Sequence, residues 1–139
     1  MALPRALDED LLRSTGLSLT QYIVLMHLSE TEGNCMRMND LAAATALSAS
    51  RITRLVETLR VQGLVVKRRH STDARGSTAV LTEAGRRRLM RAYPAHLASA
   101  RRRVVDQLDP ALVHKLAEGL QSVADPLVSR RPVYWGAAG

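Results

Sequence analysis

The chain has 139 residues, a formal net charge of +7 and one cysteine, Cys35. A single cysteine excludes an intrachain disulfide framework, and a chain of this length buries enough apolar surface to fold without disulfides or metals. The positive charge favours a polyanionic partner, and the low aromatic content, 3% with no Phe, argues against the base-stacking surfaces that bind single strands. Duplex DNA is therefore the expected partner.

The first residues show no sign of an export signal or a membrane-spanning segment. Asp8, Glu9 and Asp10 interrupt the region where a signal peptide needs an apolar stretch. The apolar run at residues 22–26 is far shorter than the roughly 20 residues of a membrane-spanning helix. We therefore expect a cytoplasmic protein with no membrane partner.

Apolar spacing predicts a mainly α fold with one strand-like interruption in the middle of the chain. Ser18 and Gln21 have the spacing of a capping box. This pair predicts a helix over about residues 19–30, and the segment 31–34, which contains a glycine, is expected to be a loop.

Two abutting helices are expected next. Asn39 is the expected N-cap of a short, alanine-rich helix over residues 40–46. Ser48 is the expected N-cap of a helix over residues 49–62, and Gly63 is expected to end that helix in a left-handed conformation.

The helix over residues 49–62 is amphipathic. Its apolar residues recur at helical spacing and form one buried stripe: Ile52, Leu55, Val56 and Leu59. The opposite and flanking positions are polar and basic: Ser50, Arg51, Thr53, Arg54 and Glu57. This helix is therefore expected to present a short basic face to solvent.

A β-hairpin with a basic tip is expected after this helix. Residues 64–69 and 78–81 are rich in β-forming residues, and a polar, turn-forming segment separates them. Thr82 is then expected to cap a long helix that reaches about residue 107 and is kinked at Pro94. The apolar side of that helix consists of Leu89, Tyr93, Leu97, Ala100 and Val104.

The last predicted helix has Asp109 as its N-cap and Pro110 in its first turn. Its apolar residues form a narrow seam: Leu112, Leu116, Leu120, Val123 and Leu127. The expected organisation is an N-terminal segment (1–17), a DNA-binding region (18–82), dimerisation helices (83–129) and a flexible tail (130–139).

A helix, a tight turn, a second helix and a basic hairpin in this order predict a winged helix-turn-helix, whose second helix enters the major groove of DNA. Arginine donates two parallel hydrogen bonds to guanine, and short hydroxyls reach base edges or phosphates. The expected recognition residues are Ser48, Ser50, Arg51, Thr53 and Arg54. The expected wing residues are Arg68, Arg69, Asp73 and Arg75.

Arg75 lies beside Gly76, where a guanidinium could enter a narrow minor groove, and Asp73 could orient it. Arg68 and Arg69 have an alternative interpretation as edge-strand charges that discourage aggregation. The recognition face has the alternative of an ordinary solvated helix face. The runs at 86–88 and 101–103 are interpreted as solvated helix faces.

These segments resemble the MarR family of bacterial transcription regulators from about residue 17 to residue 127. The resemblance lies in GLSLTQYIVL, RMNDLAAATALSASRITRLVETLRVQGLV, the wing with Asp73 and Arg75, VLTEAGRRRL and YPAH. It implies a homodimer built from the terminal helices, a palindromic operator, and release of repression by a small phenolic or otherwise lipophilic effector. The segment before Ser18 is short for the family's first dimerisation helix.

Dimerisation also has a physical argument, because the seam of the last helix needs a partner surface. The expected dimerisation residues are Leu97, Val104, Leu112, Leu116 and Leu120. Two recognition helices would then lie roughly 34 Å apart on a pseudo-palindromic operator. An effector that favours a wider spacing would weaken operator binding through its differential affinity for the two states. Tyr22, His27 and Tyr93 are candidates to line its pocket, with a role in the core as the alternative.

No catalytic motif is recognised, and we expect neither enzymatic activity nor a cofactor or metal. A metal site at His96, His114 and Glu118 is conceivable, but a surface pair at helical spacing is the simpler interpretation of the last two. A redox sensor using Cys35 is a further alternative. An architectural or protein-interaction winged-helix module without ligand control, a constitutive repressor and an activator also remain open.

Overall fold

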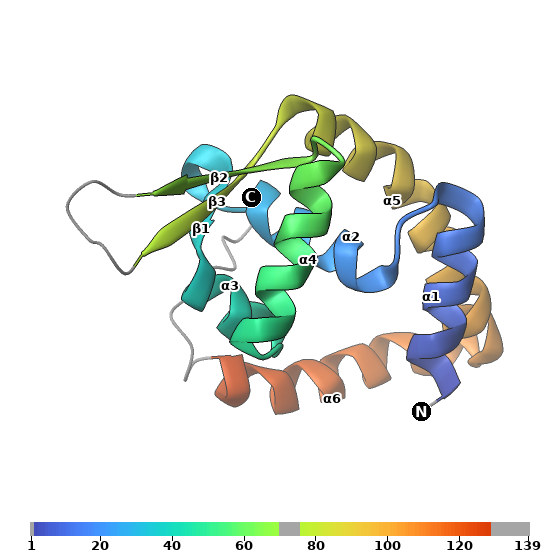
Figure 1. Cartoon of the computed structure of the whole chain (residues 1–139). Coiled ribbons are helices and arrows are strands. Elements are labelled where there is room, and N and C mark those ends of the chain that lie inside the picture. Colours follow the sequence, from blue (N-terminus) through green and yellow to red (C-terminus); the bar gives the residue numbers. More distant parts are fainter. Residues whose placement is uncertain (1, 70–75, 129–139) are drawn as a thin grey trace.

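Helices and one small sheet make up the part of the chain that the structure describes, residues 2–69 and 76–128 of a computed structural model (Figure 1). Within these residues there are six α-helices and a three-stranded antiparallel sheet. The predicted fold class, mainly α with a small β-wing, is confirmed. The predicted wing residues Asp73 and Arg75 and the predicted tail (130–139) lie outside the described residues.

In chain order the elements are α1 (Ala2–Thr15), α2 (Leu19–Ser29), the 3-10 turn η1 (Glu32–Asn34), β1 (Cys35–Arg37), α3 (Met38–Thr45), α4 (Ala49–Val61), β2 (Val65–Arg69), β3 (Ser77–Leu81), α5 (Glu83–Arg103), the 3-10 turn η2 (Val105–Gln107) and α6 (Pro110–Val128).

The predicted helix starts of α2, α4 and α5 are confirmed by their capping hydrogen bonds. The Ser18 hydroxyl accepts from the Gln21 N–H at 3.2 Å, and the Ser18 N–H donates to the Gln21 side chain at 3.0 Å, which completes the capping box. Ser48 and Thr82 each accept one backbone N–H in the same way. Gly63 has a φ of 72° after α4, the left-handed stop predicted from the sequence.

The start of α3 differs from the prediction. This helix begins at Met38, so Arg37 rather than Asn39 occupies the N-cap position, with an extended backbone and no side-chain capping bond. The reason is the unpredicted strand β1, in which Cys35 lies opposite Val80 of β3. Because β1 is extended up to Arg37, the helix follows the strand directly.

The sheet has the strand order β1-β3-β2, with both pairings antiparallel. The predicted hairpin is confirmed as β2 and β3, which begin one residue later and one residue earlier than predicted. Lys67 of β2 and Met36 of β1 both lie opposite Ala79, the fully buried centre of the sheet. Strand β1 therefore joins the β2–β3 hairpin to the helical part of the protein.

The long helix α5 passes through Pro94 and ends at Arg103, before the predicted end near residue 107. The backbone of Val104 (φ −124°, ψ −65°) is no longer helical, and η2 follows it. The segment before Ser18, which the family resemblance compared with a first dimerisation helix, forms α1, although no residue pattern had predicted that helix. These two differences concern neighbouring parts of the fold, because α1 packs along α5.

The core lies around α2, which packs against α1, α3 and α5. It contains apolar side chains from every α-helix except α6 and from all three strands: Leu11, Tyr22, Val24, Leu25, Leu28, Met36, Leu41, Ile52, Val56, Leu59, Val65, Ala79, Leu81, Leu89 and Ala92. Burying one such leucine contributes roughly 1.5–3 kcal/mol. The core therefore fixes α4 by one face and leaves its other face at the surface.

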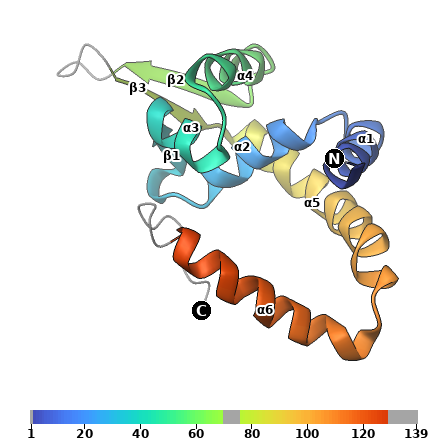
Figure 2. The same ribbon diagram turned by 90° about the horizontal axis from the view of Figure 1, so that it is seen from below.

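Helix α6 projects from this body and makes no extensive contact with another described element (Figure 2). The apolar side chains of its predicted seam are exposed in the single chain: Leu112, Leu116, Leu120 and Val123. No helix in residues 2–69 and 76–128 is long and apolar enough to cross a membrane.

Candidate nucleic-acid interface

The exposed face of α4 carries the predicted recognition residues. Ile52, Val56 and Leu59 are buried against the core. The polar and basic residues of the same helix are exposed: Ser50, Arg51, Thr53 and Arg54, with Ser48 at the N-cap. Figure 1 shows α4 along one face of the molecule, with the wing strands beside it. The amphipathic pattern therefore gave the correct orientation of this helix.

The arginines of α4 differ in their partners. Arg60 donates to Glu57 at 2.6–3.1 Å, and its hydrogen bonds hold the pKa of that carboxyl below its usual value. Arg51 and Arg54 form no ion pair with any residue that the structure describes. The positive charge of Arg60 is therefore neutralised near the C-terminal end of α4, whereas the charges of Arg51 and Arg54 nearer its N-terminal end are available to an anionic partner.

The hydroxyls near the start of α4 hold the helix itself. Ser48 accepts the Arg51 N–H at 3.3 Å and lies 3.2 Å from the Ser50 hydroxyl. The Thr53 hydroxyl donates to the Ala49 carbonyl at 2.8 Å. Each of these oxygens keeps a free lone pair or proton, which permits a further hydrogen bond to DNA.

A groove of about 680 Å³ lies between α4, α1 and the start of α2. Arg51 and Arg54 line its α4 side, and Asp8 lies on its α1 side. The Asp8 carboxylate accepts the backbone N–H of Leu19 at 2.6 Å, so α1 is tied to the first turn of α2. This groove was not predicted, because nothing in the sequence indicated that α1 would lie beside the recognition helix.

The described part of the wing supplies two further cations. Lys67 and Arg68 are exposed on β2, opposite Ala79 and Thr78. Lys67 was not among the predicted wing residues, although its place in a basic run was a signal. Arg69 ends β2, opposite Ser77, and its side chain lies outside the described set, as do Asp73 and Arg75.

The predicted pocket residues fall in two environments. Tyr22 is 3% exposed, and burial raises its pKa, with a smaller contribution from Tyr93. Its ring lies 4.6 Å from that of His96, measured between centroids. The side chain of Tyr93 is largely exposed on α5, and His27 is partly buried on α2. Tyr22 is therefore part of the core, and its role in an effector pocket stays a prediction.

The sequence did not associate His96 with Tyr22. The Nδ1 atom of His96 is buried and has no hydrogen-bond partner in residues 2–69 and 76–128, and burial lowers the pKa of His96. A buried ring nitrogen without a partner is costly, because it has lost water and gained no hydrogen bond. Tyr22 and His96 therefore form a ring pair in which the buried His96 Nδ1 has no hydrogen-bond partner among the described residues.

The conceivable metal site is not formed. His114 and Glu118 make an exposed pair on α6, with Nε2 3.2 Å from Oε1, whereas His96 stacks on Tyr22. Among residues 2–69 and 76–128, no three His, Cys, Asp or Glu side chains are placed to hold a metal ion. The Sγ atom of Cys35 lies 3.8 Å from the Glu32 carbonyl oxygen, and the side chain is partly exposed.

The arginine run 101–103 is exposed, as interpreted from the sequence, but each of its members also forms an ion pair. Arg103 donates from Nε and Nη2 to Asp10 at 2.7 and 3.0 Å, and Arg102 donates to the same carboxylate at 2.8 Å. The hydrogen bonds from Arg103 and Ser99 hold the pKa of Asp10 far below its usual range. This cluster joins α1 to the end of α5, where the chain turns towards α6.

Together these features define a winged helix-turn-helix protein in which α4 has an exposed basic face and the C-terminal helix projects from the body. Residues 15–76 match the family model described as MarR family. No match was found among curated protein sequences.

Solved structures extend the likeness beyond this region. AbsC, a MarR family transcriptional regulator from Streptomyces coelicolor, is 38% identical, with 91% of this chain and 85% of that chain covered and a TM-score of 0.76. Sco3205, a MarR family regulator from the same organism solved in complex with DNA, is 33% identical, with 90% and 81% covered and a TM-score of 0.78. CouR from Rhodococcus jostii RHA1, solved with p-coumaroyl-CoA bound, is 31% identical, with 89% and 85% covered and a TM-score of 0.69.

The chain therefore belongs to the MarR family. The predicted family is confirmed, and the chain has the fold of its transcriptional regulators. Proteins of this class are generally not enzymes.

Proposed function

We propose that this protein is a sequence-specific regulator that binds double-stranded DNA as a homodimer, on a pseudo-palindromic operator in the bacterial cytoplasm, and acts as a repressor. The exposed face of α4, with two arginines that have no acidic partner among the described residues, is the observation that carries this proposal. The likeness to Sco3205, solved in complex with DNA, supports it.

In this proposal the arginines of α4 read base edges. Arg51 and Arg54 each donate two hydrogen bonds to a guanine in the major groove, while Ser48, Ser50 and Thr53 contact phosphates or base edges. Phosphate contacts along the duplex come from the exposed β2 side chains of Lys67 and Arg68. The remaining proposed wing residues are Arg69, Asp73 and Arg75.

Dimerisation is proposed to bury the exposed seam of α6. The proposed contact residues are Leu97 and Val104 of the α5 end and Leu112, Leu116 and Leu120 of α6, all of which are exposed in the single chain. An apolar strip of this kind on a projecting helix is costly to leave in water. The DNA-binding region (18–82) and the dimerisation helices (83–129) are thus separate parts of the proposed mechanism. The segment 1–17, which packs against α5 and α2, is proposed to contribute to dimerisation and to the effector pocket.

A small phenolic or lipophilic effector is proposed to release the operator. Tyr22, His27 and Tyr93 are the proposed pocket residues, and His96 adds a buried Nδ1 atom that could pair with a phenolic hydroxyl. The likeness to CouR, solved with p-coumaroyl-CoA bound, supports an aromatic acyl group as the effector class. Such a ligand acts only if it binds the released state more tightly than the DNA-bound state.

Fluorescence anisotropy tests the DNA proposal. The purified protein is titrated onto the intergenic duplex upstream of its own gene and onto a shuffled duplex of equal composition, at near-physiological salt. We expect operator binding at least about 10³-fold tighter than binding to the shuffled duplex, and loss of this preference in the double variant Arg54→Ala, Arg75→Ala. Equal, weak binding to both duplexes would favour an architectural or protein-interaction module.

A second titration tests the effector proposal. Phenolic acids and their thioesters are added to the preformed protein–operator complex, and the release of labelled DNA is measured. Binding of an active compound is measured separately by thermal unfolding. We expect the compound to raise the unfolding midpoint of the wild type more than that of His96→Phe. Failure of the whole panel to release DNA would leave a constitutive regulator.

A further inference from the structure

We propose that Asp8 determines how strongly the protein binds DNA of any sequence, by placing an uncompensated negative charge in the groove beside the recognition arginines. The inference rests on the proposed function, because it assumes that Arg51 and Arg54 face DNA. It assigns to α1 a direct effect on the DNA-binding surface, in addition to its packing against α5.

The position of the carboxylate is fixed. Asp8 Oδ1 accepts the Leu19 N–H at 2.6 Å, and the side chain is half-buried between α1 and the first turn of α2. An acidic group is stabilised at the start of a helix, where the backbone N–H groups and the helix dipole are positive. The charge is therefore held in the groove and does not sample solvent as a free surface carboxylate would.

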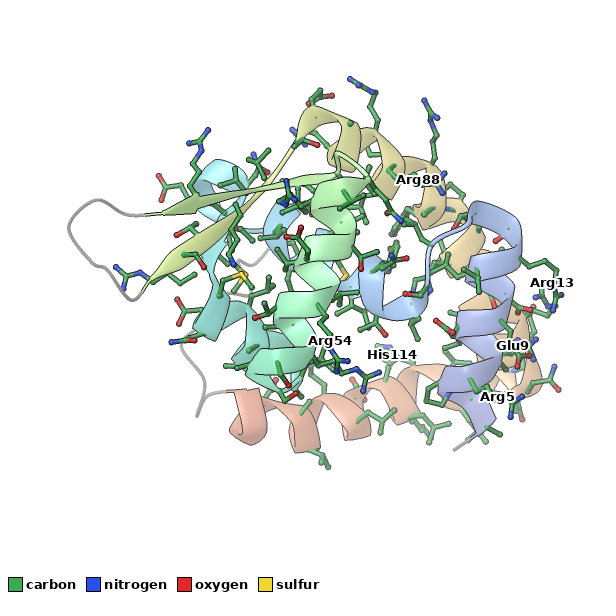
Figure 3. The ribbon with its side chains drawn as sticks, viewed as in Figure 1. Arg5, Glu9, Arg13, Arg54, Arg88 and His114 are labelled. Atoms are coloured by element: carbon green, nitrogen blue, oxygen red, sulfur yellow. The ribbon has the colours of Figure 1, made fainter. Side chains whose placement is uncertain are left out.

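Asp8, Glu9 and Asp10 form a run of three acidic residues, and among the described residues only Asp8 of the three has no ion-pair partner. Glu9 accepts from Arg5 at 2.9 Å, and Asp10 accepts from Arg102 and Arg103. Figure 3 shows Arg5, Glu9 and Arg13 on the side of α1 away from the body, whereas Arg54 extends from α4. Asp8 forms no ion pair with a residue in the described part of the chain, so no described cationic side chain pairs with its charge in the groove.

The same groove contains Arg51 and Arg54 on the opposite wall. Charges that line one solvated groove interact over roughly 8 Å at physiological salt. A DNA backbone that approaches these arginines therefore also meets the Asp8 carboxylate, which repels phosphates. Binding to DNA of random sequence depends almost entirely on phosphate attraction, so it has no base contacts to offset this repulsion.

The test compares two substitutions that change the net charge equally. Asp8→Asn keeps an acceptor for the Leu19 N–H and removes the charge in the groove, while Glu9→Gln removes a charge from the outer side of α1. We expect Asp8→Asn to bind a shuffled duplex about 2- to 5-fold more tightly than Glu9→Gln does, the size of effects between exposed charges. Its plot of log affinity against log salt should steepen by up to about 0.9.

The salt dependence separates this effect from a structural one. At about 0.5 M salt we expect the affinities of Asp8→Asn and wild type to converge, because the charge is then screened. Thr20→Asp provides a second variant if Asp8→Asn folds poorly. It adds a carboxylate to the same groove at the start of α2, where an acidic residue suits the helix, and should weaken binding to the shuffled duplex.

Two outcomes overturn different statements. If the wild type prefers its operator and Arg54→Ala weakens binding, but Asp8→Asn and Glu9→Gln behave alike across all salt concentrations, the role of Asp8 is wrong and the proposed function stands. If the wild type shows no operator preference and Arg54→Ala has no effect, the proposed function itself fails.

Discussion

Arginine side chains on α4 divide into two kinds by their surroundings. The Glu57–Arg60 pair occupies one turn and neutralises itself, so it adds little to the attraction of a polyanion. Arg51 and Arg54 have no such partner in the part of the chain that the structure describes, and they lie on the same face as two hydroxyls. Both kinds are exposed arginines on one helix, and only the positions of acidic neighbours distinguish them. The sequence shows the spacing of Glu57 and Arg60, and the structure adds that they make the contact.

His96 leads to a prediction about pH. Because burial lowers its pKa in the folded chain below the usual 6.5, folding favours the neutral ring. Its contribution to stability is therefore fully present above about pH 6.5 and is lost as the pH falls through the lower, folded-state pKa. We expect urea unfolding between pH 7 and pH 5 to show a loss of stability that is smaller in His96→Phe.

The control for this prediction is His114→Phe, which removes an exposed histidine from α6. It should retain the wild-type pH dependence. Asp10 does not interfere, because its pKa lies far below this range and it stays ionised throughout. The same pH dependence in wild type and in His96→Phe would contradict the account of the Tyr22–His96 pair.

Close contact between α5 and the start of the wing supports a second prediction. A Cβ atom added at Gly85 would collide with the backbone carbonyl of Leu64, which cannot easily move, because its oxygen accepts the Thr82 N–H. We expect Gly85→Ala to lower the free energy of unfolding by about 1–3 kcal/mol. Gly119→Ala is the matched control, since nothing lies within 4 Å of its added Cβ, and it should raise helix stability by about 0.5–1 kcal/mol.

Urea unfolding followed by circular dichroism measures both variants. A Gly85→Ala protein as stable as the wild type would show that the helix and the wing do not approach as closely as the structure has them. The sequence did not reveal this contact: Gly85 lies inside a predicted helix, where glycine is merely unfavourable.

Helices with strong local signals could be predicted, and elements that depend on distant partners could not. Ser18, Ser48 and Thr82 mark helix starts by residue type and spacing alone, which is why α2, α4 and α5 begin as expected. Strand β1 has three residues, too few for a recognisable alternation, and it exists because β3 pairs with it. Asn39 is a good N-cap residue, but the strand that precedes α3 determines where that helix starts.

The assembly of the body from its helices shows the same limit. Asp10 and Arg103 are 93 positions apart, and no local pattern connects them. The exposed face of α4 was correctly derived from its periodicity, yet the groove with Asp8 requires knowledge of how α1 lies across α2 and α4. The proposed recognition residues were therefore within reach of sequence reasoning, whereas their electrostatic surroundings were not.

The projecting helix α6 gives a prediction about assembly. Leu120 is exposed on the apolar seam, whereas Gln121 hydrogen-bonds to Asp125 at 2.6 Å on the polar side. We expect Leu120→Lys to shift the protein from dimer to monomer and to lower operator affinity, because a single α4 contacts one half-site. Gln121→Lys introduces the same residue one position later and should leave the dimer intact.

Sedimentation velocity at several protein concentrations measures the oligomeric state of both variants. A Leu120→Lys protein that remains dimeric would place the dimer contact elsewhere on the surface. A wild type that is monomeric at micromolar concentration would contradict the proposed homodimer.

The central claim is that the N-terminal half of α4 reads DNA sequence. The most direct measurement compares Arg54→Ala with Arg60→Ala, two equal changes of charge on one helix, in anisotropy titrations with the operator and a shuffled duplex. The account predicts that Arg54→Ala lowers operator affinity by about 1–3 kcal/mol and reduces the preference over the shuffled duplex, while Arg60→Ala changes neither appreciably. Equal effects of the two substitutions on both duplexes would contradict it, because binding would then depend on charge alone.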